Sequence, residues 1–483
     1  MLGFGRAAAV SADQELTSRV QRAQDERAGP VDFAPNLRER LQGLYRVGHS
    51  RVEGHKGSRL LRNVGSFQEG KFQDELEPQD HTQRLGPARC FLAGMLVRSS
   101  DAMPYFDHNA TTPLAPVARE TWLRASDENW HNPSSPYRDA AKAKIRLDNA
   151  REQLAEFLST DPKSLVFNSG ATEGAHAVLA YLAQHAHLAA RLAVSRTEHP
   201  CVLEAARRYF GERIVWLDTT RSGAVPIESV SAVLAAGACA GVVLMAANNE
   251  TGVLQPWQKV GQACRDARVP LICDASQWLG KLPAAELGEC DWVIGAGHKF
   301  GAPKGVGFIK CAAQADGFQA QPGGEQEGGR RGGTENLSSI WAMVAALAFA
   351  EQKKVFLETE RLAWRRDFER SVVSALPGAL IVAADAERLW NTVSLSLPRG
   401  ENIRWVTKLD KLGFQVSTGS ACATGKAGPS HVLSALGLST EQAQRTIRIS
   451  SGWETTREEW QALVTALIEV NKSWTESNVV VTA

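Results

Sequence analysis

The sequence has little of what marks a membrane, secreted or nucleic-acid-binding protein. Its 54 basic and 53 acidic residues leave a net charge of +1, so there is no basic excess to bind a polyanion. The longest uncharged, mainly apolar run is about Leu234 to Ala247, shorter than the roughly 20 residues of a membrane helix. Met1 to Val10, followed by Asp13 and Glu15, make a poor secretory signal and a weak transit peptide. We therefore expect neither a membrane nor a direct nucleic-acid partner.

None of the eight cysteines forms a Cys-x-x-Cys pair, the spacing that is typical of zinc and redox sites. We assign no metal ligands. The wide spacing fits buried thiols in a reducing compartment, so we expect a cytoplasmic protein. This interpretation covers all the cysteines but Cys422, which lies among small residues and is considered separately below.

The composition changes sharply near residue 103. Residues 1–102 are rich in Arg, Gln, Glu and Asp, and they carry no chemical motif. We expect a poorly ordered N-terminal extension there, and Met103 as the true start of the protein is a hypothesis. Residues 103–355 predict a large domain, whose first residues could pack with a smaller one, and residues 356–483 predict that smaller α+β domain with the Cys422 loop.

Within 103–355, apolar β-rich runs alternate with amphipathic helical patterns, which predicts an α/β fold with a mostly parallel seven-stranded sheet covered on both faces. The expected strands are Ser164–Asn168, Leu192–Ser195, Ile214–Leu217, Gly241–Ala246, Leu271–Asp274, Trp292–Gly295 and Gly307–Lys310. The expected helices are Pro136–Phe157, Gly174–His185, His199–Tyr209, Pro226–Ala235, Gln258–Arg268 and Asn336–Val355. A long helix near 340–375 leads to the C-terminal region. Its expected elements are the strands Thr392–Ser396 and Ile447–Ser450 and the helices Trp405–Leu412, Ser430–Leu436 and Glu458–Asn471.

Two charged residues lie at the ends of strands that should be buried. Lys299 follows an apolar strand, where a free ammonium is costly, and a Schiff base with a carbonyl cofactor would remove the charge. Asp274 needs a cationic partner such as a protonated pyridine nitrogen, and Gln277 could donate to the phenolate oxygen of the same ring. The plainer alternatives are an exposed loop lysine and an aspartate at a helix N-cap.

Three other strand ends carry polar groups. The turn Ser169 to Gly174 opens a helix, so its backbone N–H groups, its dipole and the Thr172 hydroxyl favour an anion. His199 can stack on a ring and exchange protons, and the segment Asn248 to Gly252 supplies an amide. Each signal alone is weak, since small turns and structural histidines are common. Because α/β sheets bind ligands at the carboxyl ends of their strands, all five together predict a cofactor site.

Two features of the C-terminal region suggest how a substrate is handled. The segment Ser417 to Pro429 consists mainly of small residues, and we interpret it as a mobile loop in which Lys426 favours the reactive thiolate of Cys422. The alternative is an incidental exposed cysteine. Arg448 lies in an apolar strand and suits a substrate carboxylate, although a structural ion pair explains it equally well.

Together these segments resemble the class V, fold-type I pyridoxal-phosphate (PLP) enzymes, and within them the group I cysteine desulfurases, which carry a long loop. The similarity runs from about Tyr105 to Asn471. Further segments in the family's order are Asp107-His108-Asn109-Ala110-Thr111-Thr112, Asn132-Pro133-Ser134-Ser135, Gly332-Gly333-Thr334, Gly419–Cys422 and Pro429–Leu433.

The resemblance implies a fold-type I PLP-dependent transferase that converts L-cysteine to L-alanine. The sulfur would pass through an enzyme persulfide to an acceptor protein, for iron–sulfur clusters or thiolated tRNA. A homodimer is also implied.

The resemblance further implies a role for each matching residue. Those that would hold PLP are Lys299 by a covalent bond, Asp274 at the pyridine nitrogen, His199 stacked on the ring, Ala171, Thr172 and His298 at the phosphate, Asn249 and Gln277 by further contacts, and Thr334 at the phosphate of the neighbouring subunit. Those that would act on substrate are Lys299, His199, Asn249, Arg448 at the carboxylate and Cys422 at the sulfur.

The sequence departs from the family pattern in places. Ala296 stands where a phosphate-binding Ser is usual, the His usual after Asn-Pro-Ser-Ser is replaced near Tyr137, and residues 1–102 have no counterpart. Three other functions stay open: a selenocysteine lyase, a class V aminotransferase with an incidental cysteine, and a cofactor-free scaffold that keeps the fold.

Overall fold

The computed structural model describes residues 103–419 and 429–476. The predicted extension 1–102 and the predicted nucleophile Cys422 lie outside these ranges. Among the helices of the described ranges, none combines the length and the apolar character needed to cross a bilayer.

Seven strands form the main sheet, in the order β1-β7-β6-β5-β4-β2-β3. Their bounds are β1 Leu165–Asn168, β2 Arg191–Ser195, β3 Ile214–Leu217, β4 Cys239–Val243, β5 Leu271–Asp274, β6 Trp292–Ala296 and β7 Gly307–Lys310. Only β7 runs antiparallel to its neighbours β1 and β6, and the other strands all point the same way. The predicted α/β fold with a mostly parallel seven-stranded sheet is therefore confirmed, and the carboxyl ends of β1, β2, β4, β5 and β6 share one edge.

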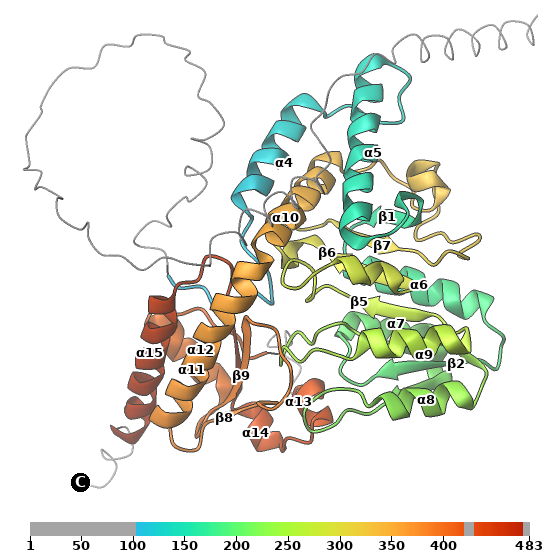
Figure 1. Cartoon of the computed structure of the whole chain (residues 1–483). Helices are drawn as coiled ribbons and strands as arrows, with labels where there is room; N and C mark the ends of the chain where they lie inside the picture. The colour runs from blue at the N-terminus through green and yellow to red at the C-terminus, as the bar shows by residue number, and fades with distance from the viewer. Residues whose placement is uncertain (1–102, 420–428, 477–483) are drawn as a thin grey trace, which may run out of the picture. The chain divides into compact units, whose positions relative to one another are not determined.

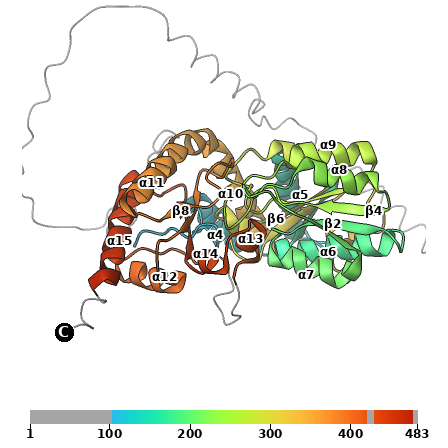
Figure 2. The ribbon, with the colours of Figure 1, turned by 90° about the horizontal axis from the view of Figure 1, so that it is seen from below.

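Helices cover both faces of this sheet. The helices α6 (Ala171–His185) and α7 (Pro200–Phe210) lie on one face, and α5 (Arg138–Leu158), α8 (Ile227–Ala235), α9 (Trp257–Ala267) and α10 (Leu337–Phe356) contribute to the core on the other. Figure 2 shows α6 and α7 on the opposite side of the strands from α8 and α9. In β5, Ile272 packs with the α6 and α7 core while Leu271 and Cys273 pack with the other core. Burial on both faces explains why these strands read as continuous apolar runs.

The helix α4 (Pro116–Glu128) was not among the predicted elements. It packs against α10, but its buried residues are only Ala118, Thr121 and Ala125. Small and polar side chains on the buried face give almost no apolar periodicity, so the pattern on which the prediction depended was absent.

A smaller antiparallel sheet lies in the C-terminal part, in the order β10-β9-β8. Its strands are β8 Leu380–Ile381, β9 Thr392–Ser396 and β10 Thr446–Ser450. The accompanying helices are α11 Leu362–Ala375, α12 Asn402–Lys411, α13 His431–Ala435, α14 Thr440–Gln444 and α15 Arg457–Glu476 (Figure 1). The predicted long helix near 340–375 is α10 and α11, joined by a π-helical turn at Leu357–Arg361. Phe106, at the start of the described chain, is buried in the core of this second sheet.

A buried ion pair fixes the segment that leads to Thr334. Arg151 in α5 donates from both terminal nitrogens to Glu327, at 2.7 and 2.8 Å. One Glu327 oxygen also accepts from the backbone N–H of Phe167 in β1, at 2.8 Å. Glu327 is buried and has a left-handed backbone with φ of 53°, so its conformation depends on these contacts.

We expect Arg151→Met to lower the free energy of unfolding by about 3–5 kcal/mol, because it leaves the Glu327 carboxylate buried and unpaired. Denaturant unfolding of the purified chain measures this loss. The matched control is Lys144→Met, which removes an exposed pair with Asp148 and should cost no more than about 1 kcal/mol. Equal losses in the two variants would contradict the structural role of the Arg151–Glu327 pair.

Candidate functional site

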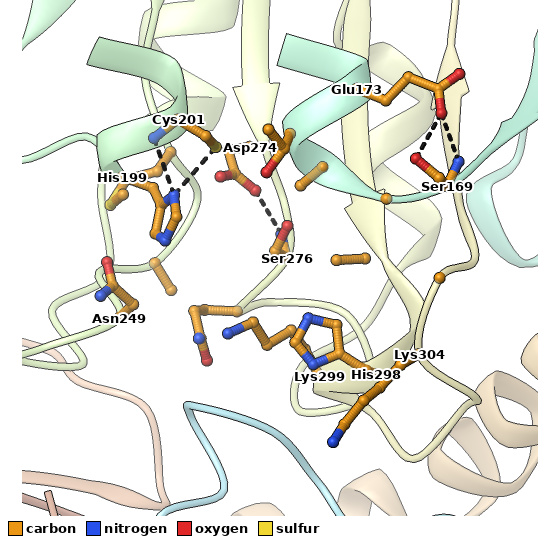
Figure 3. A pocket seen from close by; sticks show the side chains of 18 residues that line it. Ser169, Glu173, His199, Cys201, Asn249, Asp274, Ser276, His298, Lys299 and Lys304 are labelled. Carbon is orange, nitrogen blue, oxygen red and sulfur yellow. Dashed lines mark hydrogen bonds between the residues drawn. The ribbon is translucent and has the colours of Figure 1, made fainter. Parts of the chain in front are cut away.

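One cavity of about 430 Å³ lies at the shared carboxyl edge of the strands. Within the described part of the chain, every residue predicted to hold the cofactor except Thr334 lines it. These lining residues are Ala171, Thr172, His199, Asn249, Asp274, Gln277, His298 and Lys299. Figure 3 shows side chains from different strand ends converging on this space.

The amine of Lys299 lies in the turn after β6 and is held by backbone oxygens. Its Nζ donates to the carbonyl oxygens of Asn109 and Ala110, at 2.8 and 2.9 Å. Burial lowers the pKa of Lys299 to about 8, and the positive charge of Arg448 adds to this effect. About a tenth of such amines are neutral at pH 7, so Lys299 is a far better nucleophile than an ordinary lysine.

Asp274, the last residue of β5, is 6% exposed. Its Oδ1 accepts from the backbone N–H of Ser276 at 2.9 Å. Among the residues that the structure describes, no Lys, Arg or His lies within ion-pair distance of its carboxylate. Because this buried carboxylate has no cationic side chain beside it in the described residues, it is suited to a cationic group of a ligand, such as a protonated pyridine nitrogen.

His199 follows β2 and forms the N-cap of α7. Its Nδ1 accepts from the backbone N–H of Cys201 at 3.2 Å and lies 3.0 Å from the Cys201 sulfur. Burial lowers the pKa of His199, and the nearby Asp274 opposes this only in part. A neutral His199 ring therefore carries its proton on Nε2, which leaves that N–H free to move a proton in the cavity.

The turn between β1 and α6 provides an anion site. Gly170 adopts φ of 140°, which favours glycine, and α6 starts at Ala171. The first N–H groups of this helix have no partner within it, so they and the Thr172 hydroxyl can hold a phosphate. Glu173 steadies the turn by accepting from the N–H and the hydroxyl of Ser169, at 2.9 and 2.5 Å.

His298 and Ala296 border the same space. Burial lowers the pKa of His298 to about 4, with Lys299 adding to the effect, so its ring is neutral and can donate one N–H. Ala296 lines the cavity at the position where the sequence suggested a missing hydroxyl, and Ser169 and Ser276 supply hydroxyls elsewhere in the lining.

The donor set fits PLP. It combines a nucleophilic amine, a buried carboxylate without an ion pair, a neutral imidazole and a helix N-terminus within one cavity of sufficient size. PLP needs each of these groups, for its aldehyde, its pyridine nitrogen, its ring face and its phosphate.

Arg448 in β10 does not line the cavity but contacts a residue that does. Its NH1 donates to the carbonyl oxygens of Asn249 and Gly419, at 3.0 and 3.2 Å, and its NH2 pairs with Asp107 at 2.6 Å. The structure thus contains the ion pair that the sequence left as an alternative, beside a residue predicted to bind substrate. Gly419 is the last described residue before 420–428, the segment that contains Cys422.

Thr334 is exposed and does not contribute to the cavity of its own chain.

Sequence reasoning missed Cys201, Ser276 and Lys304, which also line the cavity. Cys201 and Ser276 each stand two residues after a predicted site residue, so proximity to these strand ends was an available signal. No sequence signal could have marked the carbonyl of Asn109, because every residue type has a backbone carbonyl.

Comparisons with known proteins give a consistent result. A family model described as aminotransferase class-V matches residues 104–463. A relative named cysteine desulfurase IscS from Shewanella halifaxensis is 32% identical over 366 residues, which is 74% of this chain and 89% of the relative. The cysteine desulfurase IscS of Dictyoglomus turgidum is 32% identical over 363 residues, 74% of this chain and 91% of the relative.

Solved structures are similar as well. A NifS-like protein is 27% identical with a TM-score of 0.69, and the match covers 77% of this chain and 99% of that one. The structure described as SspA in complex with cysteine is 27% identical with a TM-score of 0.63, over 72% of this chain and 98% of that one.

The pKa of Lys299 predicts how PLP would attach to the cofactor-free chain. We expect the attachment rate to rise about tenfold per pH unit below pH 8 and to level off above it, because only the neutral amine reacts. The rate is measured from the visible absorbance after mixing, and Lys299→Ala should give no such absorbance. A rate that keeps rising to about pH 10 would mean an ordinary lysine.

Proposed function

Because this chain belongs to the class V aminotransferase family and, within it, to the cysteine desulfurases, we propose that it uses PLP to take sulfur from L-cysteine and release L-alanine. One observation carries the proposal most directly. The Lys299 amine of lowered pKa and the buried Asp274 carboxylate, which the fold brings from separate strands, line the same cavity.

PLP, when bound, acts as an electron sink for the bonds around the α-carbon of an amino acid. In our proposal Lys299 holds the cofactor covalently, Asp274 keeps its pyridine nitrogen protonated, and His199 stacks on its ring. Ala171, Thr172 and His298 hold the phosphate, and Asn249 and Gln277 hold the ring. A cavity wall of neutral imidazoles suits this arrangement, since a neutral His199 can give its Nε2 proton near the substrate.

For the substrate, we propose that Arg448 and Asn249 bind the carboxylate. Arg448 already reaches the carbonyl of Asn249, so a ligand next to Asn249 lies close to its guanidinium. Cys422 would attack the substrate sulfur as a thiolate. The bond between the substrate β-carbon and its sulfur breaks, a sulfur–sulfur bond to Cys422 forms, and the carbon skeleton keeps the electron pair and takes up a proton to become alanine.

The persulfide of Cys422 would then pass its sulfur to an acceptor protein, for iron–sulfur clusters or thiolated tRNA. We also propose a cytoplasmic location, where such thiols stay reduced. In the described ranges, Cys201, Cys239, Cys264, Cys273, Cys290 and Cys311 are all free thiols.

We further propose a homodimer in which Thr334 reaches the phosphate in the partner's cavity. Thr334 is exposed and lies outside its own chain's cavity, so it is available to a neighbour. Large apolar side chains are exposed on α4, on α5 and between them, as expected for a contact surface: Trp122, Leu123, Trp130, Tyr137 and Ile145.

The decisive experiment is sulfide release from L-cysteine in the presence of a thiol reductant. We expect Cys422→Ala to reduce the rate at least about 100-fold, because it removes the nucleophile, while PLP absorbance stays unchanged. The matched control is Cys239→Ala, since Cys239 is a half-buried thiol outside the cavity and should keep full activity.

Other outcomes of this experiment identify the alternatives. Transamination that survives Cys422→Ala, with no sulfide from the wild type, would point to an aminotransferase. A much higher rate on selenocysteine than on cysteine would point to a selenocysteine lyase. Absence of PLP binding by the wild-type chain would overturn the proposal altogether.

We expect the wild-type chain to sediment as a dimer, and the double variant Trp122→Glu and Ile145→Glu to sediment as a monomer with weaker PLP binding, because charges would replace apolar contacts and the partner's Thr334 would be lost. Val355→Glu, which changes an exposed apolar residue at the end of α10, is the control and should stay dimeric. A monomeric wild type would refute the dimer.

A further inference from the structure

Lys281 is a buried amine that the proposed chemistry does not use. It is 5% exposed and lies in the turn after β5. Its Nζ donates to Oε1 of Gln277 at 3.0 Å, and in residues 103–419 and 429–476 no carboxylate lies within ion-pair distance of it. Burying an ammonium without a counter-charge is costly, so a contact other than an ion pair must account for it.

The contact with Gln277 has a direction. In its protonated form, below about pH 7, the Lys281 amine can only donate, so it selects the carbonyl oxygen of the Gln277 amide and leaves the NH₂ group on the other side. One N–H of that group donates to the Asn109 carbonyl at 2.9 Å. With the amide flipped, Oε1 would face the Asn109 oxygen and the NH₂ would face the ammonium, so both contacts would be lost. The second N–H of Gln277, which lines the main cavity, remains for a ligand.

The same network reaches Lys299. The Asn109 carbonyl accepts from Gln277 and from the Lys299 amine, at 2.9 and 2.8 Å. Lys281 and Lys299 also line a small space of about 30 Å³, together with His108 and Lys353. Burial lowers the pKa of Lys281 to about 7, and the charges of Lys299 and Arg448 add to this, which shows how unfavourable the position is for a cation.

We propose that Lys281 is a positioning residue that fixes the Gln277 amide so that an N–H, not its oxygen, faces the ring oxygen of PLP. This inference rests on the proposed PLP site. Lys281 would act on the bound cofactor through Gln277 and would contact neither the substrate nor the cofactor.

The test is Lys281→Met, which keeps an unbranched side chain, one heavy atom shorter, and removes the donor. A donor at the ring oxygen stabilises its anionic form, so losing the fixed N–H should raise the midpoint of the pH-dependent change in PLP absorbance. We expect a rise of about 0.5–1 pH unit and a PLP dissociation constant about 3- to 10-fold higher. Below pH 7, where Lys281 is charged, the melting temperature should stay equal or rise, because an unpaired buried charge is removed.

Lys310→Met is the matched control. Lys310 is also a buried lysine, but its amine donates to the backbone oxygens of Cys290 and Asp291, and it does not line the cavity. Its replacement should leave the absorbance midpoint and the PLP dissociation constant unchanged.

A double-mutant cycle tests the route of the effect. In a Gln277→Ala background, Lys281→Met should change neither the midpoint nor the dissociation constant, because the group through which it acts is gone. Equal effects with and without Gln277, or none in the wild-type background, would overturn the inference and leave the proposed function intact. If the wild-type chain binds no PLP, the proposed function fails and the inference with it.

Discussion

The carbonyl of Asn109 is the contact on which the site depends most. It accepts from the amine of Lys299 and from the amide of Gln277, two groups that follow different strands of the main sheet. The side chain of the same residue donates to the Asn249 carbonyl and to the hydroxyl of Thr392, and its N–H donates to Ser450. One residue near the start of the described chain therefore joins the turns of the large sheet to the strands of the small one.

Burial drives the titratable groups around the cavity toward their neutral forms. It lowers the pKa of Lys299 and Lys281, lowers that of His298, and raises that of Glu198 to about 8. Glu198 is wholly buried and accepts from the Met245 N–H at 2.6 Å. A site of this kind provides nucleophiles and proton carriers near neutral pH.

How well the sequence predicted each helix and strand depends on how that element is buried. The strands of the main sheet were predicted to within one residue at each end, because most of their residues are buried and apolar. The exception is β4, which spans Cys239–Val243 where Gly241–Ala246 was expected. The helix α4 was missed, since its buried side is made of Ala118, Thr121 and Ala125. For the site, the strand-end motifs and the family resemblance named many of the residues that line the cavity, but Cys201, Ser276 and Lys304 were missed. Arg448 was placed in its ion pair with Asp107 only by the structure.

By itself, the sequence determined the α/β fold, the strand ends that carry polar residues and the types of group available there, because these depend on local pattern and on the common direction of parallel strands. The tertiary structure decided which way each amide and amine is held. The contacts of Asn109 with Lys299, of Lys281 with Gln277 and of Arg448 with Asp107 join groups whose roles no local pattern marks. Their geometry follows from packing of the whole core, because burial leaves each donor only the acceptors that the fold brings within reach.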